Sequence, residues 1–135
     1  MTEMAADPSS VPIYPAQSDM QPNARRLLVF VRAAGRVRAL CEGETGADSQ
    51  SALLVCELSH SRVYYFPRED VRLDLLVGVA QTSHCPRKGD ASYFAFRAAD
   101  GPVVAWSYED PIEKAMPLGG YVAFYEDHVT LDIEG

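Results

Sequence analysis

From Arg25 onward the chain is a succession of short apolar or alternating runs separated by turn-forming residues. Ala52 to Glu57 is a nearly continuous apolar run, whereas Ser92 to Arg97 alternates its side chains. Val63 to Phe66 is β-branched and aromatic, and Pro67 ends it. Runs of this length predict strands, because a helix needs a longer pattern with a period of 3.6 residues. The sequence therefore predicts a mainly β fold.

Helix is expected only as turns near Arg68–Leu76 and Pro111–Met116. Gly43 lies between two of the predicted strands, which favours a hairpin there. The predicted strands are Val37–Leu40, Thr45–Asp48, Ala52–Glu57, Val63–Phe66, Ser92–Arg97, Val103–Tyr108, Tyr121–Tyr125 and Val129–Ile133.

An internal similarity joins two of these regions. Val63–Asp74 aligns without gaps with Tyr121–Asp132, and Phe, Val, Leu and Asp coincide at matching places. If the similarity is a duplication, each half is a small antiparallel sheet that buries one face against the other. Alternating strands also match by chance, so both interpretations stay open.

The domain organisation follows from the prolines. Residues 1–24 contain Pro8, Pro12, Pro15 and Pro22 among small and polar residues, which predicts a flexible tail. Residues 25–135 are then a single β domain, large enough to bury a core of its own.

Charge and cysteine content exclude several classes of protein. The 135 residues carry 12 Lys and Arg against 19 Asp and Glu, a net charge of −7. We therefore expect no nucleic-acid partner, which would require a basic surface. Three cysteines without framework spacing, and no apolar run of membrane length, predict a reduced cytoplasmic protein with no membrane partner. The oligomeric state is left open.

The segment Thr82–Gly89 concentrates reactive chemistry in a turn. Cys85, Pro86, Lys88 and Gly89 combine a thiol, a fixed backbone angle, a cation and a chain reversal. A nearby ammonium favours the thiolate, so Cys85 is the candidate catalytic nucleophile. In that interpretation His84 or His128 is the base. In the alternative, Cys85 is a half-buried turn cysteine, and Lys88 is solvated or paired with a carboxylate.

Aromatic and basic residues at strand ends are candidate ligand-binding groups. Trp106 and Tyr108 are two positions apart on a predicted strand, so they face the same side and could stack on a planar ligand. Tyr65 could line the same cleft. Arg68 follows Pro67 where the chain leaves the sheet, a position suited to binding an anion. Alternatively, the aromatic side chains pack between sheets and Arg68 pairs with Asp70 or Glu57 to fix a loop.

Short motifs follow one another in a set order along the chain: Gly46–Ser49, Tyr64–Val71, Cys85–Gly89, Ala105–Tyr108, Pro111 and Gly120–Tyr125. With these motifs the chain resembles the DUF427 family of uncharacterised small domains, over roughly Arg36 to Ile133. The resemblance implies a β-tent fold, with two clasped antiparallel sheets related in shape to Mss4-like zinc domains.

Two residues depart from the family pattern. The family usually has an aromatic residue where Arg87 stands, and His84 is not expected before Cys85. A nucleotidyltransferase label attached to the family is not supported, because such enzymes need spaced carboxylates beside a Gly-Ser turn. Gly46–Ser51 supplies one carboxylate, that of Asp48. No CxxC or HxxxH pattern is present, so we expect no metal and no cofactor.

These observations lead to three hypotheses of function. The first is a small-ligand-binding domain, with or without enzymatic activity, whose cationic and aromatic pocket accepts a small anionic or planar ligand. The second is a cysteine-dependent enzyme that uses Cys85. The third is a protein-interaction module. The residues expected to line the pocket are Tyr65, Arg68, Cys85, Lys88, Trp106 and Tyr108.

Overall fold

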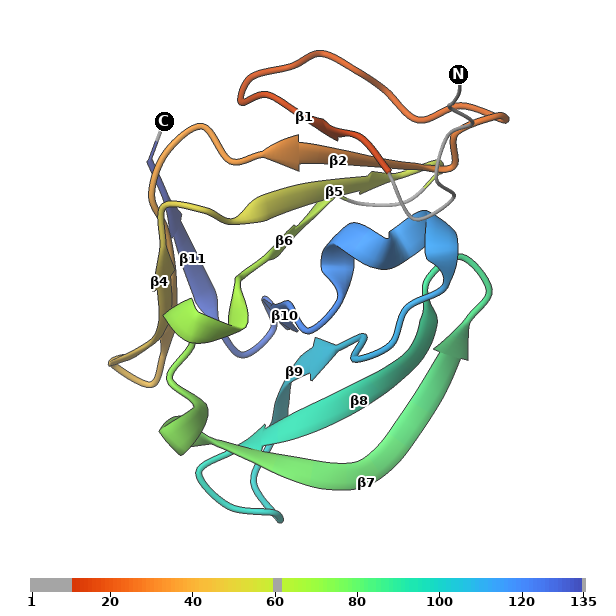
Figure 1. The fold of residues 1–135 in the computed structure, drawn as a ribbon. Coiled ribbons are helices and arrows are strands. Elements are labelled where there is room, and N and C mark those ends of the chain that lie inside the picture. The colour runs from red at the N-terminus through yellow and green to blue at the C-terminus, as the bar shows by residue number, and fades with distance from the viewer. Residues whose placement is uncertain (1–10, 60–61, 135) are drawn as a thin grey trace.

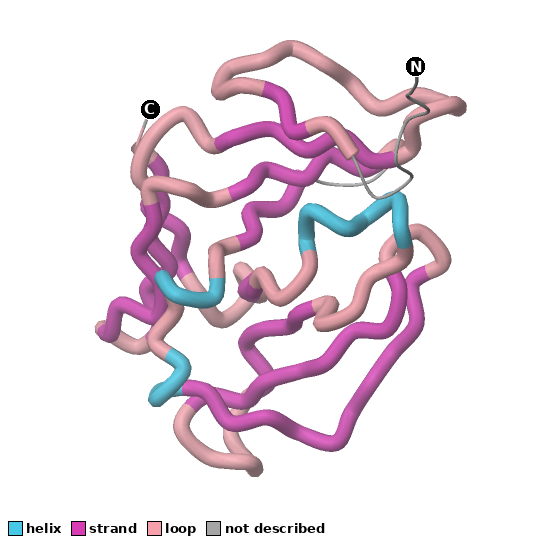
Figure 2. Tube along the Cα trace, in the orientation of Figure 1, coloured by secondary structure: helices cyan, strands magenta, loops and turns pink. Residues whose placement is uncertain are grey.

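The computed structural model describes residues 11–59 and 62–134, which form three sheets (Figures 1 and 2). The first has the order β1-β2-β5-β6, formed by Ile13–Tyr14, Leu28–Arg32, Leu53–Glu57 and Arg62–Tyr65. The second has the order β10-β9-β8-β7, formed by Val122–Phe124, Val103–Ser107, Gly89–Phe96 and Leu76–Cys85. The third has the order β11-β3-β4, formed by Thr130–Ile133, Val37–Cys41 and Glu44–Ser49.

Within residues 11–59 and 62–134, helix is confined to short 3-10 segments: η1 at Arg68–Asp70, η2 at Leu73–Leu75 and η3 at Glu113–Leu118. The prediction of a mainly β domain with antiparallel sheets and little helix is confirmed. The strands are divided among three sheets where the sequence predicted two. Among the described residues, no helix is both long enough and apolar enough to cross a membrane.

The sheets enclose the core between them. In Figure 1, β1, β2 and β5 lie at the top, β7 and β8 lie at the bottom, and β4 and β11 stand at the left. The 3-10 helix η3 fills the space between the upper and lower sheets, where Leu118 is buried against Phe30 and Tyr108. Burial of such large apolar side chains is the main force that holds the sheets together.

Phe66 and Phe124 connect the first sheet to the second. The two buried rings meet edge to face, with centroids 5.6 Å apart. Just beside them, Phe66 and Val122 exchange backbone hydrogen bonds of 2.8 and 2.9 Å. This contact brings the end of β6 next to β10, which is in turn hydrogen-bonded to β9.

Part of the segment predicted as a tail contributes a strand. Ile13–Tyr14 pairs in parallel with Phe30 and Val31 of β2, and Tyr14 packs on a cluster that contains Val31. Pro12 and Pro15 flank this two-residue strand. Neither proline, which cannot donate a backbone hydrogen bond, therefore lies within the pairing. Residues 1–10 of the predicted tail lie outside the described residues.

The sequence did not predict β7, the longest strand. Leu76–Cys85 contains Gly78 and a polar stretch, Gln81–His84, so it lacks the apolar alternation of a strand with one buried face. It lies at the edge of its sheet, with a register shift between Val79 and Thr82. Polar residues and a bulge are typical of edge strands, which have few side chains to bury.

Candidate functional site

Four of the six predicted site residues line one pocket, which has a volume of about 300 Å³. Tyr65 comes from the end of β6, Lys88 from the turn between β7 and β8, and Trp106 and Tyr108 from the end of β9. The lining residues are Glu57, Val63, Tyr65, Lys88, Tyr93, Trp106, Tyr108 and Tyr125. Five of these eight side chains are aromatic.

The pocket lies on one face of β9. Trp106 and Tyr108 both line it, whereas Ser107, between them, is completely buried on the other side. This is the alternation of an extended chain, in which successive side chains point to opposite faces. Tyr93 lies directly opposite Trp106 on β8, which adds a third ring to the same face.

The aromatic side chains contact one another in defined geometries. Trp106 Nε1 donates a hydrogen bond of 3.2 Å to the hydroxyl oxygen of Tyr65, and the two rings are nearly perpendicular. Trp106 also contacts Tyr125, with ring centroids 4.5 Å apart. Tyr93 and Tyr125 are almost parallel, and the Tyr93 hydroxyl is 2.7 Å from Ser83 Oγ. These contacts fix the ring planes and preorganise the wall of the pocket.

The charged part of the pocket is an ion pair between Lys88 and Glu57. Lys88 Nζ donates to Glu57 Oε1, while Arg87 Nη1 lies 3.2 Å from Glu57 Oε2. Lys88 also lies over the ring of Tyr108, 5.9 Å from its centroid. The sequence left Lys88 to activate Cys85, to be solvated or to pair with a carboxylate. In the structure it pairs with the carboxylate of Glu57.

Gly89 makes the turn that presents Lys88. Its backbone has a φ of +120°, a conformation that side chains disfavour, and Pro111 Cα lies 3.3 Å from where a Cβ would stand. The N–H of Ile112 donates to the carbonyl of Lys88 at 2.9 Å. The turn Cys85–Gly89, predicted from its proline and glycine, is therefore anchored on the segment that precedes η3.

Arg68 does not line this pocket. Its guanidinium donates to the carbonyl oxygen of Gly120 at 2.8 Å and to Glu109 Oε2 at 2.9 Å, and it reaches Ser107 Oγ at 3.4 Å. Since Ser107 faces away from Trp106, Arg68 lies on the opposite side of β9. The expectation that Arg68 and Lys88 share one pocket is therefore not met.

Arg68 instead fixes a loop, as the alternative interpretation held, but its partners differ from those expected. The sequence pointed to Asp70 or Glu57. In the structure Asp70 accepts a hydrogen bond of 2.6 Å from Ser49 Oγ, and Glu57 lies beside Lys88 and Arg87. The partners of Arg68 come from the end of β9 and from the turn before β10, which no local pattern in the sequence connects with residue 68.

Cys85 lies at the end of β7, half-buried against the cluster that contains Tyr65 and Tyr108, and it is not among the residues that line the pocket. The ammonium of Lys88 lies on Glu57, and His84 Nδ1 is 2.8 Å from Asp90 Oδ1. Lys88 and His84, two of the groups expected to activate the thiol, are thus engaged with carboxylates. The third, His128, is exposed between β10 and β11. This arrangement matches the alternative interpretation of Cys85 as a half-buried turn cysteine.

Burial perturbs the phenols of the pocket. It raises the pKa of Tyr65 and of Tyr108 well above the ordinary value for tyrosine. Burial, followed by a hydrogen bond with Tyr93, raises the pKa of Tyr125 to about 12. A tyrosine hydroxyl is neutral near pH 7 even at its ordinary pKa, and the raised pKa values keep all three groups protonated further into the alkaline range. A neutral phenol can donate a hydrogen bond to a ligand.

Three pocket residues with polar groups were missed from the sequence: Glu57, Tyr93 and Tyr125. Glu57 carried a usable signal, because it is a carboxylate at the end of a buried apolar strand. Tyr93 and Tyr125 sit in the predicted strands 92–97 and 121–125, but the sequence alone does not say which face of a strand borders a pocket. Among residues 11–59 and 62–134, no group of three His, Cys, Asp or Glu side chains lies close enough together to hold a metal ion.

Comparison with known proteins gives one result. The family described as "Domain of unknown function (DUF427)" matches residues 30–135, from the middle of β2 to the end of the chain. No curated protein matches the chain. The matched region contains every residue of the aromatic pocket and most of the three sheets. This chain belongs to the DUF427 family.

Proposed function

We propose that this protein is a small-ligand-binding domain whose pocket accepts a planar ring. The observation that carries the proposal is the convergence of five aromatic side chains on a hollow of about 300 Å³. Aromatic side chains often serve as packing, but here they surround a space that opens beside an ion pair. Ligand pockets of this kind combine apolar walls with a few placed polar groups.

The charges of the pocket favour a neutral or weakly polar ligand over a strong anion. Lys88 and Glu57 both line the pocket and compensate each other, and the other lining side chains are uncharged. An anion would have to compete with Glu57 for Lys88. A planar heteroaromatic ring would stack on Trp106 or Tyr125 and exchange hydrogen bonds with the phenols.

Tyr65 supports this choice of ligand. Its oxygen accepts the hydrogen bond from Trp106 Nε1, which leaves its own hydroxyl hydrogen for another acceptor. A ring nitrogen or carbonyl oxygen of a heteroaromatic ligand supplies such an acceptor. Because Tyr65 is only 2% exposed, an acceptor must enter the pocket to reach that hydrogen.

Trp106 reports directly on binding, because it is the single tryptophan of the chain and it lines the pocket. The test is a fluorescence titration with quinoline, purine and nicotinamide, using cyclohexanol as a non-planar probe. We expect at least one planar probe to quench Trp106 saturably, with a Kd below about 1 mM, and cyclohexanol to leave the emission unchanged. Equal responses to planar and non-planar probes, or none to any planar probe, would contradict the proposal.

Variants identify the site. Tyr125→Leu keeps an apolar side chain of similar bulk but removes the ring face, and a stack of this kind is worth about 1–3 kcal/mol. We therefore expect the affinity of the planar probe to fall about tenfold. Tyr14→Leu, at a tyrosine of β1 that does not line the pocket, is the matched control and should leave the affinity unchanged.

The remaining expectations belong to the same proposal. All three cysteines are free thiols, which supports the cytoplasmic location expected from their spacing. The relation to Mss4-like domains that the family resemblance implies stays a prediction about the fold. The partner that we propose is a small molecule.

A further inference from the structure

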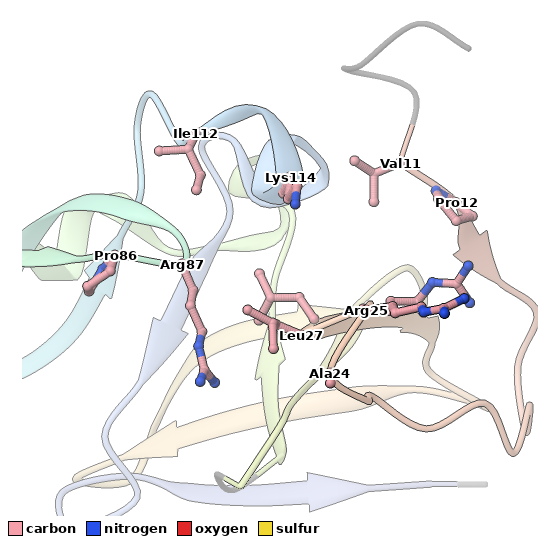
Figure 3. Close-up of a pocket in the computed structure, with 11 residues that line it drawn as sticks. Val11, Pro12, Ala24, Arg25, Leu27, Pro86, Arg87, Ile112 and Lys114 are labelled. Atoms are coloured by element: carbon pink, nitrogen blue, oxygen red, sulfur yellow. The ribbon is translucent and has the colours of Figure 1, made fainter.

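A second hollow borders the turn that carries Lys88, at Pro86 and Arg87, and its volume is about 550 Å³. Figure 3 shows side chains from four separate parts of the chain around it: the N-terminal segment, the residues before β2, the turn after β7 and the segment that leads into η3. The lining residues are Val11, Pro12, Ala24, Arg25, Arg26, Leu27, Leu28, Pro86, Arg87, Ile112 and Lys114.

The composition of this lining is unusual for so acidic a protein. Four of the eleven lining residues are Arg or Lys and none is Asp or Glu, although the whole chain has a net charge of −7. Most of the other lining residues are apolar. Cations gathered around a concave surface create a local positive potential that raises the concentration of anions there.

Two of the four cations are already engaged. Arg26 lies over the ring of Tyr14, 5.8 Å from its centroid, and Arg87 contacts Glu57. The other two, Arg25 and Lys114, are exposed, and neither forms an ion pair with a carboxylate in the part of the chain that the structure describes. They remain available to an anionic ligand.

The position of Arg25 is fixed by its backbone. Asn23 Oδ1 accepts hydrogen bonds from the N–H groups of Arg25 at 2.9 Å and of Arg26 at 3.0 Å. The same turn closes through backbone hydrogen bonds between Asn23 and Arg26. Arg25 therefore belongs to a hydrogen-bonded turn shortly before β2 and not to an irregular loop.

The apolar lining is open to water. Leu27 is 38% exposed and Ile112 is 40% exposed, and both belong to this hollow. Figure 3 shows Leu27 between Arg25 and Arg87, with Ile112 and Lys114 on the facing segment. Apolar side chains that stay exposed next to unpaired cations favour a ligand with both an apolar and an anionic part.

We propose that this hollow binds an amphipathic carboxylate, in which the carboxylate reaches Arg25 and Lys114 and an apolar chain covers Leu27 and Ile112. The volume falls within the range of small-molecule pockets. The net charge of −7 disfavours a polyanion such as nucleic acid, but a single carboxylate meets only the local cations. The site is separate from the aromatic pocket, so this proposal does not depend on the function proposed above.

The test uses sodium decanoate, decanol and sodium acetate in calorimetric titrations of the full chain. We expect decanoate to bind once per chain with a Kd below about 1 mM. Decanol should bind at least about tenfold more weakly, because it lacks the charge, and acetate should not bind, because it lacks the chain. Decanoate should leave Trp106 emission unchanged, since Trp106 lines the other pocket.

Variants separate this site from general charge effects. The double variant Arg25→Gln, Lys114→Gln should weaken decanoate binding at least about tenfold. Arg62→Gln, Arg72→Gln changes the net charge equally at two exposed residues outside the hollow and should leave binding unchanged. All four positions are exposed, and melting curves should confirm that the variants stay folded.

Several results would overturn the proposal. These are equal affinities for decanol and decanoate, equal losses of decanoate affinity in the two double variants, or no decanoate binding. Quenching of Trp106 emission over the same decanoate concentrations would also overturn it. If the protein does not bind decanoate and light scattering gives twice the mass of one chain, the hollow would be assigned to a second copy of the chain. If the double variant Glu3→Gln, Asp7→Asn binds decanoate about tenfold more tightly, the hollow would be assigned to the N-terminal segment as its occupant.

Discussion

Lys88 Nζ donates to Glu57 Oε1 in an ion pair whose two side chains are only 12% and 11% exposed. Every other ion pair among the described residues contains at least one side chain that is 30% exposed or more. Glu57 Oε2 is also 3.2 Å from Arg87 Nη1, so one carboxylate serves two cations. Removal of one partner from such a buried pair leaves a charge without compensation.

The two members of the pair should differ in their contribution to stability. Glu57→Gln deprives two cations of their shared carboxylate and should lower the free energy of unfolding by about 3 kcal/mol or more. Lys88→Gln leaves Glu57 with Arg87 and should cost about 1–3 kcal/mol. Urea denaturation measures both. Arg72→Gln, which removes the exposed pair with Asp74, is the control and should change stability by less than about 0.5 kcal/mol. Equal losses at Glu57 and Lys88 would contradict the shared-carboxylate arrangement.

The buried phenols predict that stability falls at alkaline pH. Tyrosine in the unfolded chain has a pKa of about 10, whereas the folded-state pKa of Tyr125 is raised to about 12. Between these values the unfolded chain loses the proton and the folded chain keeps it. The stabilising contribution is therefore complete below pH 10 and is lost as the pH rises to about 12.

Denaturation series at several pH values from 9 to 12 measure this slope, and Tyr125→Phe tests its origin. The variant has no phenol at position 125, so its free energy of unfolding should decline less steeply over the same pH range. Tyr14→Phe, at a residue outside the pocket, should retain the full slope. A slope unchanged in Tyr125→Phe would show that Tyr125 does not titrate as its burial implies.

Cys85 should react like an ordinary thiol. The ammonium of Lys88 pairs with Glu57 and the imidazole of His84 lies beside Asp90, so both groups are engaged with carboxylates, and His128 is exposed. We expect iodoacetamide to alkylate Cys85 at pH 7 no faster than it alkylates glutathione. Peptide mapping measures the rate, and the buried Cys41 and Cys56 serve as slow internal references. A rate about tenfold above that of glutathione would favour the hypothesis of a cysteine-dependent enzyme.

Gly89 should not tolerate a side chain. An alanine at this position would have to adopt a φ of +120° and would bring Cβ to 3.3 Å from Pro111 Cα. We expect Gly89→Ala to cost about 1–3 kcal/mol in thermal or urea denaturation. Gly78→Ala is the matched control, because no atom lies within 4 Å of its Cβ position and it should cause no loss. Equal effects of the two substitutions would show that the turn can relax around a side chain.

Most of the strands that the sequence predicted contain buried side chains. Leu53–Glu57 and Val103–Ser107 are mostly apolar, and both form strands close to their predicted bounds. The pattern failed at the edge strand Leu76–Cys85, which buries little, and at the very short Ile13–Tyr14. It also missed Leu28–Arg32, which is buried at four of its five positions but lies directly after the segment predicted as a tail. Periodicity reports burial, so an element without a buried face leaves little trace in the sequence.

The site was predicted where local rules suffice. Trp106 and Tyr108 share a face because they are two positions apart on an extended chain, and Lys88 is presented by a turn that Pro86 and Gly89 specify. The prediction that Arg68 lines the pocket failed because its partners, Glu109 and Gly120, are far away in the sequence. Long-range partners depend on how the sheets pack, and one sequence does not reveal this.

The short strand β1 has a practical consequence. The family match begins at residue 30, inside β2, whereas β1 covers the outer edge of β2 through Phe30 and Val31. A protein trimmed to the matched region would lose β1 and the buried residues Leu28 and Val29, and it would present the unpaired edge of the remaining strand to other molecules. Such a truncated domain would be prone to self-association, so recombinant work should retain at least the residues from Val11 onward.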